Sequence, residues 1–201
     1  MKTSDYDITI VPEECVADRA VLLSRRLQTR NPQFLLSPTG PFAHVSLYMV
    51  RLQDDKVDEV MERLGKVAAE NHELELKATQ YMQAEGYIDI EYQKVSQIDE
   101  LQMQVVESIS PLRAGLRARD EQRLSTFPVQ LQMSLKQYGY RYVGEAFRPH
   151  MTFTRFTSVK PIAVGSLSDP TEFDGLFTAI ALFELGDNGT CVREVARIPL
   201  A

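Results

Sequence analysis

The sequence has 201 residues, of which 44% are hydrophobic and 25% charged, and its formal net charge is −6. This length fits one domain, or one domain with two lobes, and it is long enough to bury a sizeable core. The acidic balance argues against binding of long nucleic acid, which needs many Lys and Arg contacts to phosphates, but it leaves room for a small phosphorylated ligand.

Targeting and redox signals are few. No apolar run reaches the roughly 18 residues of a membrane-spanning helix, and the first residues lack the apolar core of a signal peptide. Cys15 and Cys191 have no metal-ligand spacing, which indicates reduced, structural thiols. We therefore expect a cytoplasmic protein with no membrane partner.

Strand and helix patterns alternate through the first part of the chain. Residues 6–11 are rich in β-branched side chains and predict a strand, which Pro12 ends. Helical apolar spacing predicts helices over 17–30 and 56–69, and a strand with His44 lies between them, over 43–52.

The second part of the chain repeats this alternation. Two strands over 74–82 and 87–92 are joined by a turn at Glu85-Gly86, and a long helix over 96–112 follows. The other expected elements are a helix over 129–138, a strand over 149–156, a loop over 159–174, and strands over 176–185 and 191–200. Because strands flank helices in both halves, we expect an α+β fold in one domain, 1–201, with two similar lobes.

The strand over 149–156 has an unusual polar face. Side chains of a strand alternate, so His150, Thr152 and Thr154 share one face and Arg155 points to the other. An imidazole with two hydroxyls is not typical of a half-buried strand.

The strand over 43–52 has the same pattern. His44, Ser46 and Tyr48 share a face, so two of the three histidines are followed, two residues on, by a hydroxyl. A single such histidine is usually structural, but the matched pair favours a shared site.

Two facing imidazoles can act as general acid and general base, because histidine titrates near neutral pH. The hydroxyls can donate hydrogen bonds to oxygens of a phosphoryl group held between the strands. No carboxylate cluster stands near either histidine in the sequence, which weakens a two-metal mechanism. The pattern predicts metal-independent phosphoester chemistry with no cofactor.

The motifs His44-Val-Ser46-Leu and His150-Met-Thr152-Phe resemble the paired signatures of the two-histidine (2H) phosphoesterase superfamily, which includes 2′-5′ RNA ligases and 2′,3′-cyclic nucleotide phosphodiesterases. The second motif, with Pro149 before it and Arg155 after it, is similar to the bacterial ligase-like branch. The resemblance implies a bilobal α+β fold, in which two antiparallel sheets flank a central cleft and the helices lie outside.

The resemblance also implies roles. His44 and His150 are the expected catalytic pair, and Ser46 and Thr152 hold the phosphate. Family habit makes the first histidine the proton donor, but the sequence leaves the direction open. Ser46 stands where Thr is commoner, which keeps the hydroxyl.

Some further side chains are candidates for binding substrate. Tyr48 could stack on a base and Arg155 could reach a phosphate, although a packed aromatic and an ion pair are the competing interpretations. The stretch 112–127 looks exposed, and its arginines are interspersed with acidic residues, so a solvated surface is the favoured interpretation: Arg113, Arg117, Arg119 and Arg123. His72 fits a surface role.

The most favoured function is hydrolysis of the 2′,3′-cyclic phosphate of a small nucleotide or of a short RNA end, by a monomer. Two alternatives stay open: cleavage or joining of 2′-5′ linkages, and a nucleotide-binding module without turnover. A purely structural protein with two core histidines is a third.

Overall fold

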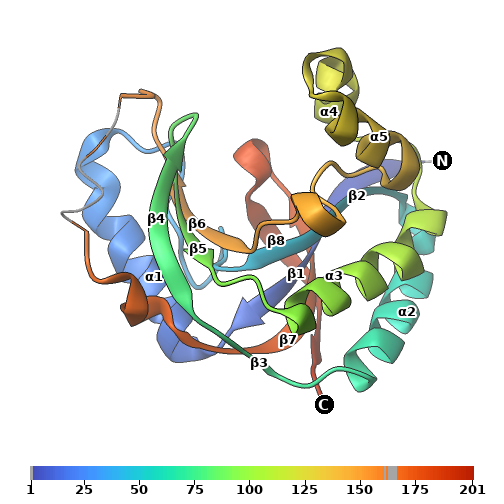
Figure 1. Ribbon diagram of the computed structural model, residues 1–201, viewed down its shortest axis with the longest axis horizontal. Helices are drawn as coiled ribbons and strands as arrows, with labels where there is room; N and C mark the ends of the chain where they lie inside the picture. Colours follow the sequence, from blue (N-terminus) through green and yellow to red (C-terminus); the bar gives the residue numbers. More distant parts are fainter. Residues whose placement is uncertain (1, 161, 163–166) are drawn as a thin grey trace.

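The computed structural model describes residues 2–160, 162 and 167–201, and its strands form two antiparallel sheets (Figure 1). In the larger sheet, β1 (Thr3–Pro12) lies between β2 (Val45–Gln53) and β7 (Gly175–Leu185). Along its other edge, β7 pairs with β3 (Leu74–Leu76) over residues 175–177 and with β8 (Cys191–Pro199) over residues 179–185. The central position of β1 agrees with the burial of every residue from Tyr6 to Pro12, which shows that both faces of the strand are covered.

The smaller sheet has the order β4-β5-β6, with β4 (Ala78–Ala84), β5 (Tyr87–Tyr92) and β6 (His150–Arg155). Glu85 and Gly86 join β4 to β5 with φ values of 50° and 87°. Two consecutive positive φ values are typical of a tight hairpin turn. A Cβ on Gly86 would lie 2.5 Å from the Phe156 carbonyl oxygen, so glycine is required there.

Helices lie outside the sheets. In Figure 1, α1 (Glu14–Arg26) is on the side of the smaller sheet, and α2 (Val57–Ala69) and α3 (Ser96–Ile109) are together on the opposite side. Two shorter helices, α4 (Ala118–Arg123) and α5 (Val129–Tyr138), extend from the same half of the molecule as α2 and α3. Among the described residues, no helix has the length and apolar character needed to cross a membrane.

The expected α+β fold with two antiparallel sheets is confirmed. Three stretches differ from the expectation: 74–82, the first helix, and 112–127. The strand expected over 74–82 is two strands, β3 and β4, that belong to different sheets and meet at Lys77. The first helix begins at Glu14 and continues as a 3₁₀ turn over Leu27–Arg30. Part of the expected loop 159–174, namely 161 and 163–166, lies outside the described residues.

The third difference is the stretch 112–127, for which the expectation of an exposed surface is wrong in part. Asp120 is fully buried and Arg117 is 9% exposed. The two side chains form an ion pair, and a buried charge is tolerated when it is paired in this way.

Both histidine strands contain a β-bulge directly after the hydroxyl residue. In β2, Ser46 pairs with Thr9 and Tyr48 with Ile8, so Leu47 is an extra residue. In β6, Thr152 pairs with Asp89 and Thr154 with Ile88, so Phe153 is extra. A bulge breaks the period of two, and residues beyond it change face.

Candidate active site

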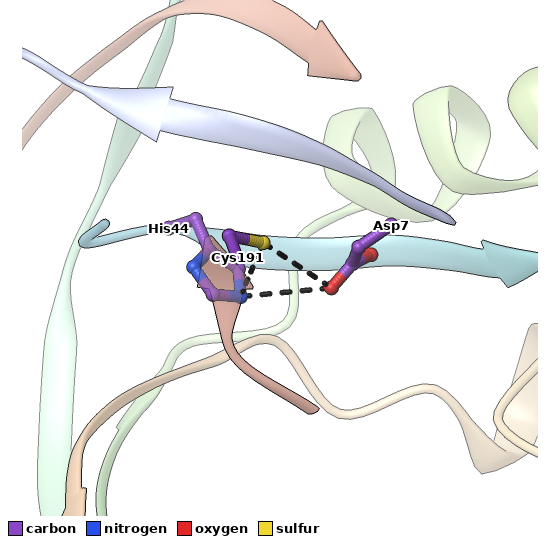
Figure 2. Close-up of side chains that lie close together, drawn as sticks. All are labelled: Asp7, His44 and Cys191. Carbon is purple, nitrogen blue, oxygen red and sulfur yellow. Dashed lines mark hydrogen bonds and ion pairs between the residues drawn. The ribbon is translucent and has the colours of Figure 1, made fainter. Parts of the chain in front are cut away.

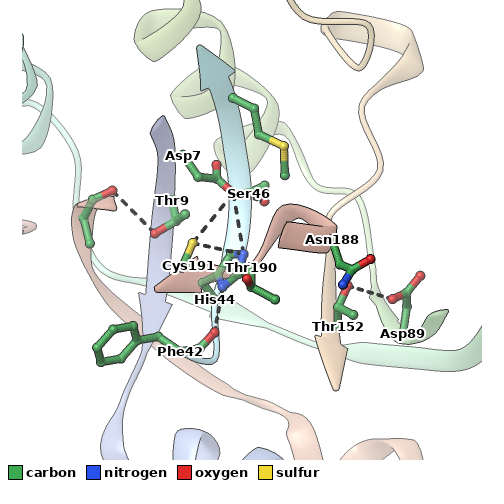
Figure 3. Close-up of polar contacts among 12 residues, drawn as sticks. Asp7, Thr9, Phe42, His44, Ser46, Asp89, Thr152, Asn188, Thr190 and Cys191 are labelled. Atoms are coloured by element: carbon green, nitrogen blue, oxygen red, sulfur yellow. Dashed lines mark hydrogen bonds and ion pairs between the residues drawn. The ribbon is translucent and has the colours of Figure 1, made fainter. Parts of the chain in front are cut away.

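One cavity of about 680 Å³ is lined by all four residues of the two motifs, His44, Ser46, His150 and Thr152. In the first pair, His44 directly precedes β2 of the larger sheet and Ser46 lies in it, and the second pair comes from β6 in the smaller sheet. The turn between β7 and β8, with Asn188 and Thr190, also lines the cavity, and Figure 3 shows it between the two motifs. The structure thus brings together the residues predicted as catalytic.

Both imidazoles are held in the same way. Nδ1 of His44 donates to the Phe42 carbonyl at 2.8 Å, and Nδ1 of His150 donates to the Arg148 carbonyl at 2.7 Å. A carbonyl oxygen only accepts, so Nδ1 carries the hydrogen in each ring. In the neutral rings, each Nε2 therefore offers a lone pair.

Each motif hydroxyl donates to a carboxylate on the neighbouring strand (Figure 3). Ser46 Oγ donates to Asp7 Oδ2 at 2.6 Å, and Thr152 Oγ1 donates to Asp89 Oδ1 at 2.7 Å. Asp7 is fully buried and Asp89 is 8% exposed. The sequence-based view that no carboxylate stands near the histidines is corrected by these two contacts.

Burial sets the protonation of these groups. Loss of hydration raises the pKa of Asp7 to about 7. Smaller effects lower this pKa, and the largest of them is the hydrogen bond from Ser46. Burial also raises the pKa of Asp89. Burial lowers the pKa of His44 to about 4, and the charge of His150 adds to this effect. At neutral pH the His44 ring is uncharged.

A third buried group lies beside His44 and Asp7. Cys191, at the start of β8, is fully buried, and Figure 2 shows its sulfur facing both side chains. Sγ lies 3.5 Å from His44 Nε2 and 3.9 Å from Asp7 Oδ2. Both cysteines are free thiols, as expected.

Tyr48 is not in the cavity, so its predicted place on the face of His44 is wrong. It is fully buried, and its hydroxyl donates to the Tyr138 carbonyl. The bulge at Leu47 reverses the alternation, so Met49 lines the cavity instead. A side chain without exposed surface cannot stack on a base.

Arg155 is affected by the second bulge. Strict alternation places it opposite His150, but its Nη1 donates to Asn188 Oδ1 at 2.6 Å and its guanidinium lies 4.7 Å from the ring centre of Tyr87. Asn188 and Tyr87 both line the cavity. Arg155 thus fixes cavity residues without lining the cavity itself. Thr154, predicted on the face of His150, is fully buried and donates to the Phe34 carbonyl.

The cavity wall is richer in arginine than the acidic chain as a whole suggests. Five arginines line it: Arg117, Arg119, Arg123, Arg141 and Arg148. Three of these were not favoured by the sequence, because the acidic residues among them indicated a solvated surface. Asp120 instead pairs with Arg117 and Arg141, so one carboxylate holds two cations at the cavity.

Asp7 and Asp89 are the main residues that sequence analysis missed. Each is an acidic residue with an apolar residue directly before and after it in a strand, in Tyr6-Asp7-Ile8 and Ile88-Asp89-Ile90. A carboxylate in an otherwise buried strand is costly unless it has partners, and that placement is the signal that could have found them.

Comparisons with known proteins agree on the fold. E. coli LigT in apo form superimposes with a TM-score of 0.62 at 11% identity, covering 100% of this chain and 99% of that chain. TT0787 of Thermus thermophilus gives 0.60 at 15% identity, covering 98% of this chain and 97% of its own. Usb1 of Kluyveromyces marxianus gives 0.50 at 10% identity, covering 98% of this chain and 97% of its own. A search of curated proteins gives no match.

One family matches the sequence itself. The family described as "Protein of unknown function (DUF1045)" matches residues 50–163, which is more than half of the chain and contains the second motif. The chain therefore belongs to the DUF1045 family, and its fold is that of the two-histidine phosphoesterases.

Proposed function

We propose that this protein is a phosphodiesterase that opens the 2′,3′-cyclic phosphate of a small nucleotide or of a short RNA end. One observation carries the proposal: two His-x-(Ser/Thr) motifs line a single cavity, and in each the imidazole is bonded to a backbone carbonyl and the hydroxyl to a carboxylate. An acid, a base and two hydroxyls around one space suit in-line attack on phosphorus.

We assign the base to His44 and the acid to His150. The His44 side chain is only 11% exposed, and burial favours the uncharged ring, which accepts a proton. His44 Nε2 takes a proton from water, whose oxygen bonds to phosphorus. The bond from phosphorus to the ribose oxygen breaks, and His150 protonates that oxygen. This direction is the reverse of the family habit.

If a motif hydroxyl donates to the phosphate, its carboxyl partner must carry a proton of its own. Each hydroxyl has one hydrogen, and in the structure Ser46 and Thr152 give theirs to Asp7 and Asp89. A hydroxyl that donates to a phosphate oxygen must therefore accept a hydrogen bond from a protonated carboxyl. The proposed holder of the phosphate is thus a carboxyl–hydroxyl pair on each wall.

The arginines support a small anionic substrate. Arg117, Arg141 and Arg148 line the cavity, and guanidinium groups are suited to phosphate oxygens. E. coli LigT has been crystallised with phosphate, with 3′-AMP and with ATP. We extend nucleotide binding to this chain on that basis, and we expect a cytoplasmic monomer.

The proposal is tested with 2′,3′-cyclic nucleotides in the presence of EDTA. His44→Ala and His150→Ala should each lose about 10²- to 10⁴-fold in turnover, the usual contribution of a general acid or base. His72→Ala is the matched control, because His72 is exposed and contacts only the Ala201 carbonyl in the described structure. Equal turnover in all four proteins would contradict the proposal.

A substrate with an activated leaving group tests the direction. p-Nitrophenolate leaves without protonation, so the acid variant His150→Ala should recover most of its loss on a p-nitrophenyl phosphodiester, while His44→Ala should not. The opposite pattern would restore the family direction.

Two other functions remain candidates on the same cavity. Cleavage or joining of 2′-5′ linkages would appear as turnover of 2′-5′ dinucleotides in the same panel. Binding of nucleotides without turnover of either substrate would identify a binding module.

A further inference from the structure

Asp7, His44 and Cys191 form a compact cluster of three metal-ligating groups. Their ligand atoms are separated by 3.5 Å from Nε2 to Sγ, 3.6 Å from Nε2 to Oδ2, and 3.9 Å from Sγ to Oδ2. Figure 2 shows the three atoms facing one another. Within the described ranges, no other group of three or more His, Cys, Asp or Glu side chains meets this ligand spacing.

These separations fit three corners of a tetrahedron around zinc. Zinc bonds of about 2.3 Å to sulfur and about 2.0–2.2 Å to nitrogen and oxygen give tetrahedral edges of roughly 3.4–3.6 Å. The nitrogen edges already have this length, and the longer sulfur–oxygen edge needs a shift of a few tenths of an ångström. Little rearrangement separates the cluster from a zinc site.

The surroundings also suit a cation. The Phe42 carbonyl fixes the hydrogen of His44 on Nδ1, so the Nε2 lone pair faces the cluster, and such a partner commonly orients a metal-binding histidine. Asp7 Oδ1 is buried and has no hydrogen-bond partner. The other oxygen, Oδ2, is the atom that faces the cluster, and an ion bound there would offset the cost of burying the carboxylate charge.

Charge and softness select the class of ion. On binding the ion, the Cys191 thiol loses its proton to solvent, and the resulting thiolate and the Asp7 carboxylate together balance a divalent charge, which limits the cost of burying the ion. Sulfur and imidazole ligands favour zinc over magnesium or calcium, which prefer all-oxygen sites. Three protein ligands leave a fourth position for water or another ligand.

We propose that Asp7, His44 and Cys191 bind one Zn²⁺ ion, and that the bound ion stops turnover by occupying Nε2 of His44. The binding step is independent of the enzymatic activity, whereas the loss of turnover rests on the proposed function. Zinc would then act as an inhibitor of a reaction that itself needs no metal.

Binding is tested first, without reference to activity. Co²⁺, a spectroscopic substitute for zinc, should give tetrahedral d–d bands and a thiolate charge-transfer band with one ion per chain, and Zn²⁺ should remove both. Cys191→Ala should lose the charge-transfer band, and Asp7→Asn should bind more weakly. Cys15→Ala is the matched control, because Cys15 is the exposed thiol.

Folding of each variant is checked by thermal melting in EDTA. Added Zn²⁺ should raise the melting temperature of the wild type and of Cys15→Ala, but not that of a folded Cys191→Ala. If Co²⁺ gives no thiolate band, or if the band is lost only in Cys15→Ala, the site is excluded. If Cys191→Ala does not fold, Cys191→Ser replaces it, and retention of the thiolate band in that variant would equally exclude the site.

Turnover is measured last, each protein being compared with its own rate in EDTA. One equivalent of Zn²⁺ should lower the wild-type rate about 10²-fold or more, the contribution of a catalytic base, and should leave the Cys191→Ala rate unchanged. A zinc-bound protein with an unchanged rate would overturn the inhibition and leave the binding site intact. A protein that binds zinc but has no activity in EDTA would instead contradict the proposed function.

Discussion

Ser46 donates its hydroxyl hydrogen to Asp7 across 2.6 Å, and the same relationship recurs on the opposite wall between Thr152 and Asp89. Each motif is therefore a unit of three side chains, imidazole, hydroxyl and carboxyl, built on two neighbouring strands. The carboxyl comes from a strand that the motif itself does not contain, which makes strand pairing part of the site.

The first prediction separates two roles for Asp89. An asparagine can donate from its Nδ2 amide to Thr152 Oγ1, as a protonated carboxyl would, so Asp89→Asn can leave the Thr152 hydroxyl free to donate to phosphate. We expect Asp89→Asn to stay within about tenfold of the wild-type kcat/KM, while Asp89→Ala loses about 10²-fold because the hydroxyl is no longer oriented. Equal losses in both variants would show that the carboxylate charge itself is needed.

A second prediction concerns stability and pH. The pKa of Asp7 is raised from 3.8 to about 7, so the folded state binds more protons than the unfolded state between these values. Stability from this group is present below about pH 4 and is lost as pH rises to about 7. Because asparagine does not titrate, the stability of Asp7→Asn does not fall in this way as pH rises.

The variant should therefore gain on the wild type as pH rises from 4 to 7, by at most about 4 kcal/mol, since one pKa unit corresponds to about 1.4 kcal/mol. Urea unfolding in EDTA at several pH values measures this difference. Parallel stability curves would mean that Asp7 titrates alike in the folded and unfolded chain.

Tyr48 provides a third prediction. Its hydroxyl donates to the Tyr138 carbonyl, so Tyr48→Phe should lower the free energy of unfolding by about 1 kcal/mol, the usual net value of such a bond. Because the ring lies outside the cavity, KM for a cyclic nucleotide should not change. A higher KM without loss of stability would place Tyr48 in substrate binding after all.

The fourth prediction concerns Arg141, which lines the cavity and lies 4.6 Å from the ring centre of Tyr142. If Arg141 binds a substrate phosphate equally in the ground state and the transition state, Arg141→Gln should raise KM about tenfold with little change in kcat. Arg113→Gln is the control, since Arg113 bonds only backbone carbonyls in the described structure. A similar KM in both variants would show that Arg141 does not bind the substrate.

The sequence predicted the fold class, most elements and the shared cavity of the two motifs, because apolar period and turn residues are local signals. It misplaced Tyr48 and the outward direction of Arg155 for one reason. Alternation was extended through Leu47 and Phe153, which are bulged residues. A bulge depends on the partner strand, so the period of a single strand does not reveal it.

The roles of Asp7, Asp89 and Arg117 were not predicted, for a related reason. Their roles depend on which strand or helix lies beside the motif, and that neighbour is far away in the chain. The pairing of Asp120 with two arginines likewise buries Asp120 and Arg117 within a stretch whose other residues are exposed or half-buried.

The chain passes from the larger sheet to the smaller sheet between β3 and β4. Only Lys77 separates a strand of one sheet from a strand of the other, and the neighbouring Ala78 amide is bonded to Asp174, where the chain crosses back. This hydrogen bond ties together the two points at which the chain passes between the sheets. Lengthening the chain by one glycine after Lys77 should therefore shift the two imidazoles relative to each other and lower the turnover of 2′,3′-cyclic nucleotides, while both sheets stay folded.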